Sequence, residues 1–391
     1  MQQLLYTFSF SLLLFLSCGG KQSGNQTAKT GISEYPKVVP FESGMANEQE
    51  LALSQIAERV EYIPLETTSA CLIKRPKAYV RYVDGKYIIS CAQAVYMFDE
   101  NGKFIRQLGS HGNGPGEYDY VQFVDADAKN GYFYLQTFGK LNTYTLDGKF
   151  VKDLPIPDAT NVGQLNDSLF ACYMYNSNGQ IKNRLILLNE KGHIVQGFRN
   201  YDHFEVANNM SYVLMNDEDR YLFRFKDNLC FRDYYNDTLF TVTETALLPR
   251  YVFQLGKYAI PLENRWETAN GDWNKYKREA SKYLQINTIE TEHYVFMPCK
   301  SWDGDELSGL VLYDKDKNTC FKMKENSIPN DLDGGIPFEP FTSIGDNTML
   351  TMWAPDKIME LAKKDPSILK HDKLKNLKED DNPVLMIVHL K

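Results

Sequence analysis

The chain has 391 residues, a net charge of −8 and an isoelectric point near 5.4. Its 43% hydrophobic content supplies enough apolar surface for a large core, which excludes a disordered chain. The acidic balance, without a basic stripe that carries interleaved aromatic residues, excludes a general nucleic-acid binder. The 25 Tyr and 22 Phe favour strands over helices.

The N-terminus carries a strongly apolar run at residues 4–17. This run is short for a membrane span and is typical of a signal peptide. Ser17, Cys18 and the glycines that follow resemble the cleavage site of a bacterial lipoprotein. We therefore expect a signal peptide at residues 1–17 and a lipid on Cys18 that contacts the membrane. The alternative is a signal peptide without lipidation and a coincidental cysteine.

Residues 18–50 are rich in Gly, Ser, Gln, Asn and Lys, which predicts a flexible, lipid-anchored tether. The folded domain is expected at residues 51–391. Its first strand is VEYIPL at residues 60–65, which stands alone before any complete repeat.

Short strand-like segments then recur in groups of about four. Turn glycines Gly102, Gly148 and Gly192 lie about 45 residues apart, a period that is typical of β-propeller blades. Six groups span residues 77–109, 120–155, 168–198, 221–256, 283–324 and 341–390. We predict an all-β fold, a six-bladed β-propeller, that is closed by pairing of residues 60–65 with the last group.

Two segments interrupt the β pattern and predict short helical insertions. The second half of residues 263–283 has helical composition, and residues 355–382 read as two helices split by Pro366. Apolar pairs with i, i+3 spacing in the second segment predict a stripe that packs on the propeller. Its lysines are interspersed with acidic residues, so we interpret them as a solvated face rather than a membrane patch.

A glycine-rich loop separates the first two groups. Its residues are Gly112, Gly114, Pro115, Gly116 and Glu117. Backbone N–H groups of such a loop can hold a phosphate. Here the loop runs into a strand and lacks the Lys-Ser/Thr and helix of a phosphate-binding loop, so we interpret it as a tight structural crossover in which Glu117 bonds loop amides.

Candidate metal ligands are scattered along the chain. Asp125 and Asp127 suit a divalent ion, but we expect their side chains on opposite strand faces. Asp303, Asp305 and Glu306 form an acidic turn without the remaining ligands of a calcium loop. The histidines that a metal or base would use are scattered over four different parts of the chain, at His111, His193, His203 and His293. The sequence does not identify a metal site, and we expect no cofactor.

Cysteine spacing offers no CxxC or Cys/His metal pattern. Without Cys18, six cysteines remain, at Cys71, Cys91, Cys172, Cys230, Cys299 and Cys320. An even count in an exported chain permits disulfides. Several of them lie inside apolar strand-like runs, so we expect mostly free, buried thiols.

The tryptophans are the candidate ligand-binding residues. Trp266 and Trp273 lie in the first insertion and Trp302 lies near a strand end. Exposed aromatic rings beside polar groups stack on sugars or peptide side chains. The alternative is that these rings hold the insertions onto the ring of blades.

Four stretches resemble a known family. GNGPGEY at residues 112–118 resembles the glycine loop of six-bladed β-propeller lipoproteins of Bacteroides-type bacteria, long catalogued as domains of unknown function. VEYIPLETT, the segment at residues 234–256 and the closing DNPV segment are similar to other parts of that family. The resemblance covers residues 58–391 and extends more loosely to NHL-type propellers. It implies an envelope-anchored propeller without a settled activity.

We therefore predict a lipid-anchored binding module of the cell envelope, most simply at the outer membrane, for a glycan, a peptide or an envelope protein. No nucleophile with a recognisable base is present, so no reaction is identified and an enzyme is the less favoured hypothesis. The alternatives are a metal-dependent lyase or hydrolase with a site in the central channel, and a structural scaffold of an envelope complex.

Overall fold

The fold is described from a computed structural model. The described residues are 35–73, 79–91, 93–204, 221–233, 235–261, 273–302 and 307–391. Within α3, the side chains of residues 273 and 275–277 are also outside the description.

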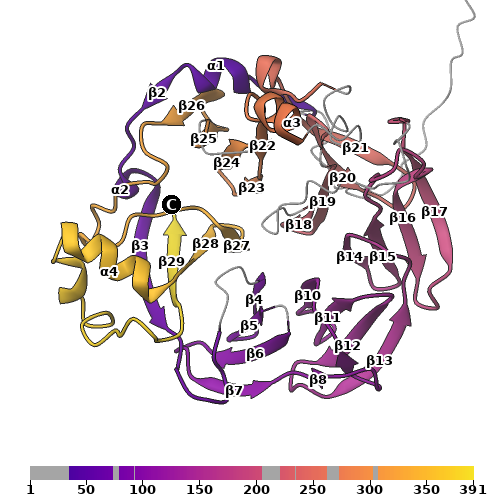
Figure 1. The fold of residues 1–391 in the computed structure, drawn as a ribbon, viewed down its shortest axis with the longest axis horizontal. Coiled ribbons are helices and arrows are strands. Elements are labelled where there is room, and N and C mark those ends of the chain that lie inside the picture. Colours follow the sequence, from indigo (N-terminus) through magenta and orange to yellow (C-terminus); the bar gives the residue numbers. More distant parts are fainter. Residues whose placement is uncertain are drawn as a thin grey trace, which may run out of the picture. The chain divides into compact units, whose positions relative to one another are not determined.

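Six antiparallel sheets surround a common axis, and the first strand of each sheet lies nearest that axis (Figure 1). In order from the axis outward, blade 1 has β4 (Tyr79–Val83), β5 (Lys86–Cys91), β6 (Ala94–Asp99) and β7 (Phe104–Gln107). Blade 2 has β10 (Phe123–Asp127), β11 (Tyr132–Thr137), β12 (Lys140–Thr145) and β13 (Phe150–Pro155). Blade 3 has β14 (Asn161–Asn166), β15 (Leu169–Tyr173), β16 (Asn183–Asn189) and β17 (Ile194–Arg199). Blade 4 has β18 (Leu222–Phe225), β19 (Asn228–Arg232), β20 (Thr238–Val242) and β21 (Leu247–Phe253); blade 5 has β22 (Leu284–Ile286) and β23 (Ile289–Glu290), both paired with β24 (Tyr294–Ser301), then β25 (Gly309–Asp314) and β26 (Thr319–Met323); blade 6 has β27 (Thr342–Gly345), β28 (Thr348–Trp353), β29 (Val384–Leu390) and β3 (Ala57–Pro64). This arrangement confirms the predicted six-bladed propeller.

Ring closure follows the predicted pairing. Strand β3 pairs antiparallel with the C-terminal strand β29, with Val60 opposite Val388. The first folded strand is thus the outer strand of the last blade. Closure removes the open sheet edges that would otherwise face each other between the first and last blades.

Blade 3 contains an inner strand that the sequence reading missed. Strand β14 has the sequence NVGQLN, whose polar residues and glycine lack the β-branched and aromatic pattern of its neighbours. The side chain of Asn161 bonds the backbone N–H of Leu222 in the next blade at 3.1 Å. Pairing with β15 and contact with a neighbouring blade, rather than local propensity, therefore stabilise this strand.

The segment before residue 51 also packs on the ring. Strand β1 (Lys37–Val39) extends blade 4 in parallel with β21, and β2 (Glu48–Gln49) extends blade 5 in parallel with β26. Helix α1 (Phe41–Met45) lies between them, and Phe41 is fully buried. The described part of the segment predicted as a flexible tether, residues 35–50, therefore packs on the ring, because its short apolar groups contact blade edges.

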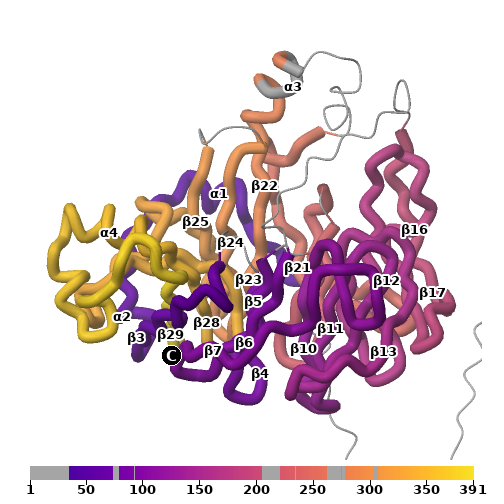
Figure 2. The backbone as a smooth tube through the Cα atoms, turned by 60° about the horizontal axis from the view of Figure 1, so that its bottom comes forward, coloured from indigo at the N-terminus to yellow at the C-terminus, as the bar shows by residue number. Residues whose placement is uncertain are grey.

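The predicted helical insertions are present. Helix α4 (Pro355–Lys364) and a 3-10 turn (Ile368–Lys370) join β28 to β29, and their buried Ile358 and Ile368 pack into the core of blades 5 and 6. Helix α3 (Trp273–Ala280) precedes β22 and projects beyond one end of the blades (Figure 2). Two smaller helical turns complete the described set, α2 (Leu53–Ile56) and a 3-10 turn (Gly256–Tyr258).

Apolar side chains fill the spaces between neighbouring blades. Between blades 1 and 2, for example, Ile88 and Met97 of blade 1 pack in one cluster with Phe133 and Leu135 of blade 2. All six cysteines of the described residues are free, and five of them are buried, which confirms the expectation of buried thiols. In the described residues, no helix has the length and apolar character of a membrane span.

Candidate functional site

The inner strands enclose a cavity of about 230 Å³ on the propeller axis. Five blades contribute to its wall, through β4, β10, β14, β18 and β27. Most inner-strand side chains there are apolar or small, but β4 carries Arg81, β18 carries Arg224, and β10 carries Asp125. The ring thus brings together charged residues that are far apart in sequence.

Arg81 is held in place by its own blade and the next. Its guanidinium lies over the ring of Phe123, 4.8 Å from the ring centroid, and Nη1 donates to the Val80 carbonyl at 3.0 Å. Its Nε lies 3.8 Å from Oδ1 of Asp125, which is longer than a hydrogen bond. Burial lowers the pKa of Arg81, and the charge of nearby Arg224 lowers it further, although Asp125 opposes the shift.

Arg224 and Asp125 are fixed from the strand between them, β14. Arg224 donates from Nη2 to the Gln164 carbonyl, and the Gln164 backbone N–H donates to Oδ2 of Asp125 at 3.3 Å. The Ala126 backbone N–H donates to the other carboxylate oxygen, Oδ1, at 3.0 Å. Backbone groups therefore satisfy much of the hydrogen-bonding capacity of Asp125 and leave the two guanidiniums under-used.

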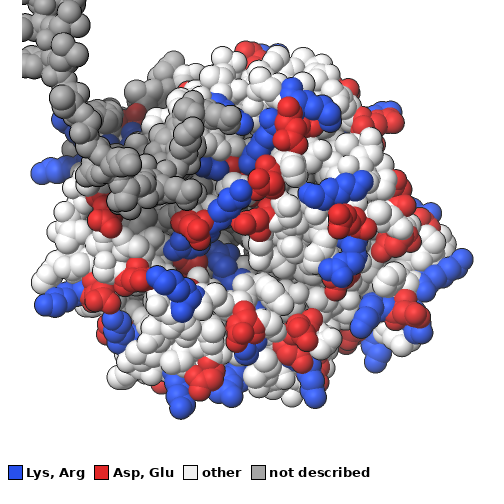
Figure 3. All heavy atoms as spheres, turned by 180° about the vertical axis from the view of Figure 1, so that it is seen from behind, with Lys and Arg blue, Asp and Glu red and all other residues white. Residues whose placement is uncertain are grey.

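The mouth of the cavity is closer to charge balance. Nζ of Lys226, in the β18–β19 turn, lies 2.6 Å from Oε2 of Glu292, and both side chains are roughly half exposed. This contact raises the pKa of Lys226 and lowers that of Glu292. Asp346, in the β27–β28 turn, accepts the backbone N–H of Lys226 at 3.2 Å. Figure 3 shows a face with a central hollow, around which charges of both signs are interspersed.

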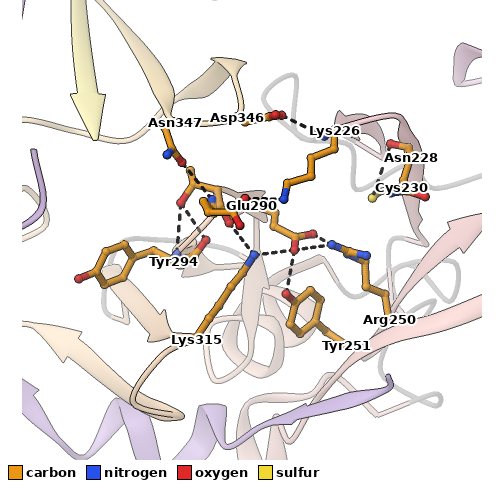
Figure 4. Close-up of polar contacts among 12 residues, drawn as sticks. Lys226, Asn228, Cys230, Arg250, Tyr251, Glu290, Tyr294, Lys315, Asp346 and Asn347 are labelled. Atoms are coloured by element: carbon orange, nitrogen blue, oxygen red, sulfur yellow. Dashed lines mark hydrogen bonds and ion pairs between the residues drawn. The ribbon is translucent and has the colours of Figure 1, made fainter. Parts of the chain in front are cut away.

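A second charged cluster lies between blades 4 and 5 (Figure 4). Glu290 is 1% exposed, and its carboxylate accepts two hydrogen bonds from Arg250, at 2.7 Å each, one from Lys315 at 2.7 Å and one from the Tyr251 hydroxyl at 2.8 Å. Phe225 covers both cations, with its ring centroid 5.3 Å from the Arg250 guanidinium and 4.5 Å from Lys315 Nζ.

This cluster is saturated by its own chain. Burial acts to raise the pKa of Glu290, but the hydrogen bonds and charges of Arg250 and Lys315 outweigh it and hold the pKa below its ordinary value. Burial lowers the pKa of Lys315. Because the carboxylate already has four donors, we interpret the cluster as a structural link between the two blades rather than as a ligand site.

The aspartates on β10 require a correction. Asp125 and Asp127 point to the same strand face, because residues i and i+2 share a face. Gln164 bonds both of them, through its backbone N–H to Asp125 and through Nε2 to Asp127 at 2.7 Å. Burial opposes ionisation of Asp127, but the bonds from Asn130 and Gln164 lower its pKa overall. Gln164 thus bonds both carboxylates, whereas the hypothesis of a divalent ion would have a metal bind them.

The other candidate metal ligands are not brought together. Among the described residues, no group of three or more His, Cys, Asp or Glu side chains has the geometry to hold a metal. His111 lies in the short strand β8 (Ser110–His111), His193 in the β16–β17 turn, and His293 beside Asp316, with Nδ1 to Oδ2 at 2.7 Å. The acidic turn at residues 303–306 lies outside the described residues.

Of the three candidate tryptophans, the structure describes the side chain of Trp302 alone. Trp302 is 7% exposed and stacks on Tyr235 with centroids 5.0 Å apart, so its ring packs within the protein rather than presenting a face to solvent. Trp273 begins α3, but its side chain, like all of Trp266, lies outside the described residues. Cys18 lies outside them as well.

The glycine loop is built around Glu117. Its Oε2 accepts the Gly114 backbone N–H at 2.8 Å, and its own backbone N–H bonds the Gly114 carbonyl at 3.0 Å. Strand β9 (Glu117–Tyr118) pairs in parallel with β8. Gly116 has a φ of +72°, and a Cβ there would lie 2.8 Å from Phe150. The loop therefore bonds itself and abuts the next blade, which leaves little room for an anion.

Sequence reasoning did not find Arg81 and Arg224. The signal was present, because each is the cation of an otherwise apolar or aromatic inner segment, YVRYV and YLFRF. A single charge in such a segment faces either solvent or a polar axis. Only the assembled ring shows that both face the same cavity.

Three solved structures align with this chain, and the first of them supports the fold. A protein described as exported, from Bacteroides fragilis, aligns with a TM-score of 0.68 and 18% identity over 91% of this chain and 100% of that chain. A duf4221 family member from Bacteroides vulgatus aligns at 0.48 with 10% identity, over 86% and 97% of the chains. The WD40 domain of Pan2 from Neurospora crassa aligns at 0.44 with 8% identity, over 87% and 98%.

The comparison with curated proteins found no match. A family model, in contrast, matches nearly the whole described propeller, from residue 36 to residue 389. The glycine loop, the closing strand β29 and its partner β3 all lie within that range, so the resemblance read from the sequence is confirmed. The chain belongs to the family described as a domain of unknown function, DUF4934.

Proposed function

We propose that this protein is an exported binding module of the bacterial envelope, and that its ligand binds in the axial cavity. The cavity carries the proposal, because five blades enclose about 230 Å³ and line it with two arginines whose donors exceed the acceptors around them. Pockets with a few convergent polar groups on a rigid scaffold are the usual form of a small-ligand site.

A ligand screen on the full chain in detergent tests this function. The panel holds small glycans, short peptides and small acids, and the readout is the melting temperature, which a ligand that binds only the folded state must raise. Ser343 lines the cavity, so Ser343→Phe should fill it and abolish the shift. Ser168, exposed in the β14–β15 turn, supplies the control Ser168→Phe, which should keep it.

Two outcomes would contradict the cavity site. A shift that survives Ser343→Phe would put the ligand elsewhere on the propeller. No shift with any panel member would favour the scaffold alternative, and envelope proteins that crosslink to the chain would then be the partners to identify.

Lipid anchoring through Cys18 is the second part of the proposal. It is supported by the apolar run at residues 4–17 and by the Ser17-Cys18-Gly19 sequence that ends it. The similar Bacteroides fragilis protein, which is described as exported, agrees with this placement. We expect a labelled fatty acid to enter the wild-type protein and not Cys18→Ser, with the variant moving from the membrane to the soluble fraction. Equal labelling of both proteins would overturn the anchor.

A further inference from the structure

The interior of the axial cavity carries an excess of positive charge. Two guanidiniums, from Arg81 and Arg224, face one carboxylate, from Asp125. At the mouth, Lys226 is paired with Glu292, and the exposed Asp346 is screened by water and salt. The uncompensated charge is therefore inside, where water screens it least.

The two arginines also hold unused hydrogen-bond donors. A guanidinium has five N–H groups. In the described structure, Arg81 donates one hydrogen bond, to the Val80 carbonyl, and Arg224 donates one, to the Gln164 carbonyl. Neither arginine has a buried nitrogen atom without a partner, so the remaining donors reach solvent in the cavity, where an acceptor that enters from solution can bind them.

The remaining wall defines the rest of the ligand. The Phe123 ring lies under the Arg81 guanidinium, 4.8 Å away at its centroid, while Leu222 and Phe225 add apolar surface from β18. The volume of about 230 Å³ is many times what one water requires. The space thus suits a compact group that has a charged end and a less polar body.

We propose that the axial cavity binds a small monocarboxylate, whose two oxygens take N–H donors from Arg81 and Arg224. This inference rests on the proposed binding function and names its ligand class. Arginine presents its donors as a planar fork that matches a carboxylate. One negative charge balances the excess of one positive charge. A phosphate dianion would instead bring a second negative charge beside Asp125.

Titration calorimetry on the full chain tests the charge of the ligand. The probes are galacturonate beside galactose, and N-acetylglycine beside its amide, so that a sugar acid and a peptide C-terminus are separate arms. We expect at least one acid to bind ten-fold or more tightly than its neutral partner, and more tightly than inorganic phosphate. Equal binding of an acid and its neutral partner would overturn the carboxylate while leaving the cavity as a binding site. Stronger binding of phosphate, or no binding of either acid, would overturn it as well.

Substitutions test the residues. Arg81→Gln and Arg224→Gln should each weaken binding of the acid ten-fold or more. Arg199, which lies over the ring of Tyr201 and does not line the cavity, supplies the control Arg199→Gln, with unchanged binding. Asp125→Asn removes the competing carboxylate and should tighten binding several-fold, a gain that unfolding does not produce. Unchanged affinity in both arginine variants, or weaker binding in Asp125→Asn, would contradict the proposal.

Discussion

Two buried charge clusters of this propeller lie on either side of Phe225 but differ in how many hydrogen bonds their charged groups make. Between blades 4 and 5, Glu290 receives four hydrogen bonds from Arg250, Lys315 and Tyr251. On the axis, Arg81 Nε lies 3.8 Å from the carboxylate of Asp125, and the hydrogen bonds of Arg81 and Arg224 go to backbone carbonyls. Phe225 contacts the first cluster and lines the cavity of the second.

The difference teaches that burial of charge does not by itself mark a functional site. A carboxylate that is saturated by its own chain has no capacity left for a ligand, and its value lies in fixing one blade against another. A group of cations whose donors reach solvent keeps its capacity to bind a ligand that carries hydrogen-bond acceptors. Counting donors against acceptors separates the two cases.

The largest expected effect is loss of the Glu290 charge. Glu290→Gln leaves Arg250 and Lys315 buried without a counter-charge, and removing one member of a buried pair typically costs about 3–5 kcal/mol. Urea unfolding should show a loss of that size. Glu360→Gln, which breaks the exposed pair with Lys357, is the control and should leave the midpoint unchanged. If Glu290→Gln lost as little unfolding free energy as the control, the cluster would not stabilise the contact between blades 4 and 5.

The stabilising effect of the Glu290 carboxylate should also depend on pH. The pKa of Glu290 is lowered in the folded protein, so its contribution is present above the ordinary value of 4.5 and is lost as the pH falls through the folded pKa. Unfolding free energies measured from pH 6 to pH 2 should therefore converge for the wild type and Glu290→Gln as the pH falls below 4.5 and through the folded pKa. Parallel curves across that range would mean that Glu290 is not ionised in the fold.

An intermediate contrast compares one arginine from each cluster. Arg250→Gln should be strongly destabilising, because Glu290 loses its two-bond partner. Arg224→Gln should change the free energy of unfolding by only about 1 kcal/mol, because the lost hydrogen bond to Gln164 is offset by less repulsion with Arg81. Chemical denaturation of the two variants checks this order, and equal losses would erase the distinction between the clusters.

The smallest expected effect lies at the cavity mouth. Lys226 and Glu292 are 47% and 41% exposed, so Lys226→Gln should cost less than about 1 kcal/mol. The same variant should weaken acid binding less than Arg224→Gln does. A greater loss of affinity in Lys226→Gln, measured by the calorimetry described above, would move the binding charge from the interior of the cavity to its rim.

The sequence was sufficient for the fold because propeller blades are local units. Each blade is built from neighbouring strands and short turns, so Gly102, Gly148 and Gly192 reveal the repeat without knowledge of the ring. Local reasoning failed at β14, which depends on the next blade, and at β1 and β2, which join blades 4 and 5 from far away in sequence.

The candidate site was less accessible to sequence reasoning for the same physical reason. Arg81 and Arg224 are 143 residues apart, and only the closed ring makes them neighbours of one cavity. Trp302 was a candidate because tryptophan near a strand end is often exposed, yet it stacks on Tyr235 and is buried. Residue type indicated chemistry in both cases, but blade packing decided which side chains a ligand can reach.

The closing strand pair has a consequence for how the chain reaches its native state. Strand β3 is synthesised early, but its partner β29 contains residues 384–390, almost at the end of the chain. Bringing such distant segments together is slow, because the intervening chain must first lose much of its freedom. Strand β3 therefore keeps an unpaired edge until residues 384–390 have been synthesised, and during that time it is open to mispairing and to chaperones.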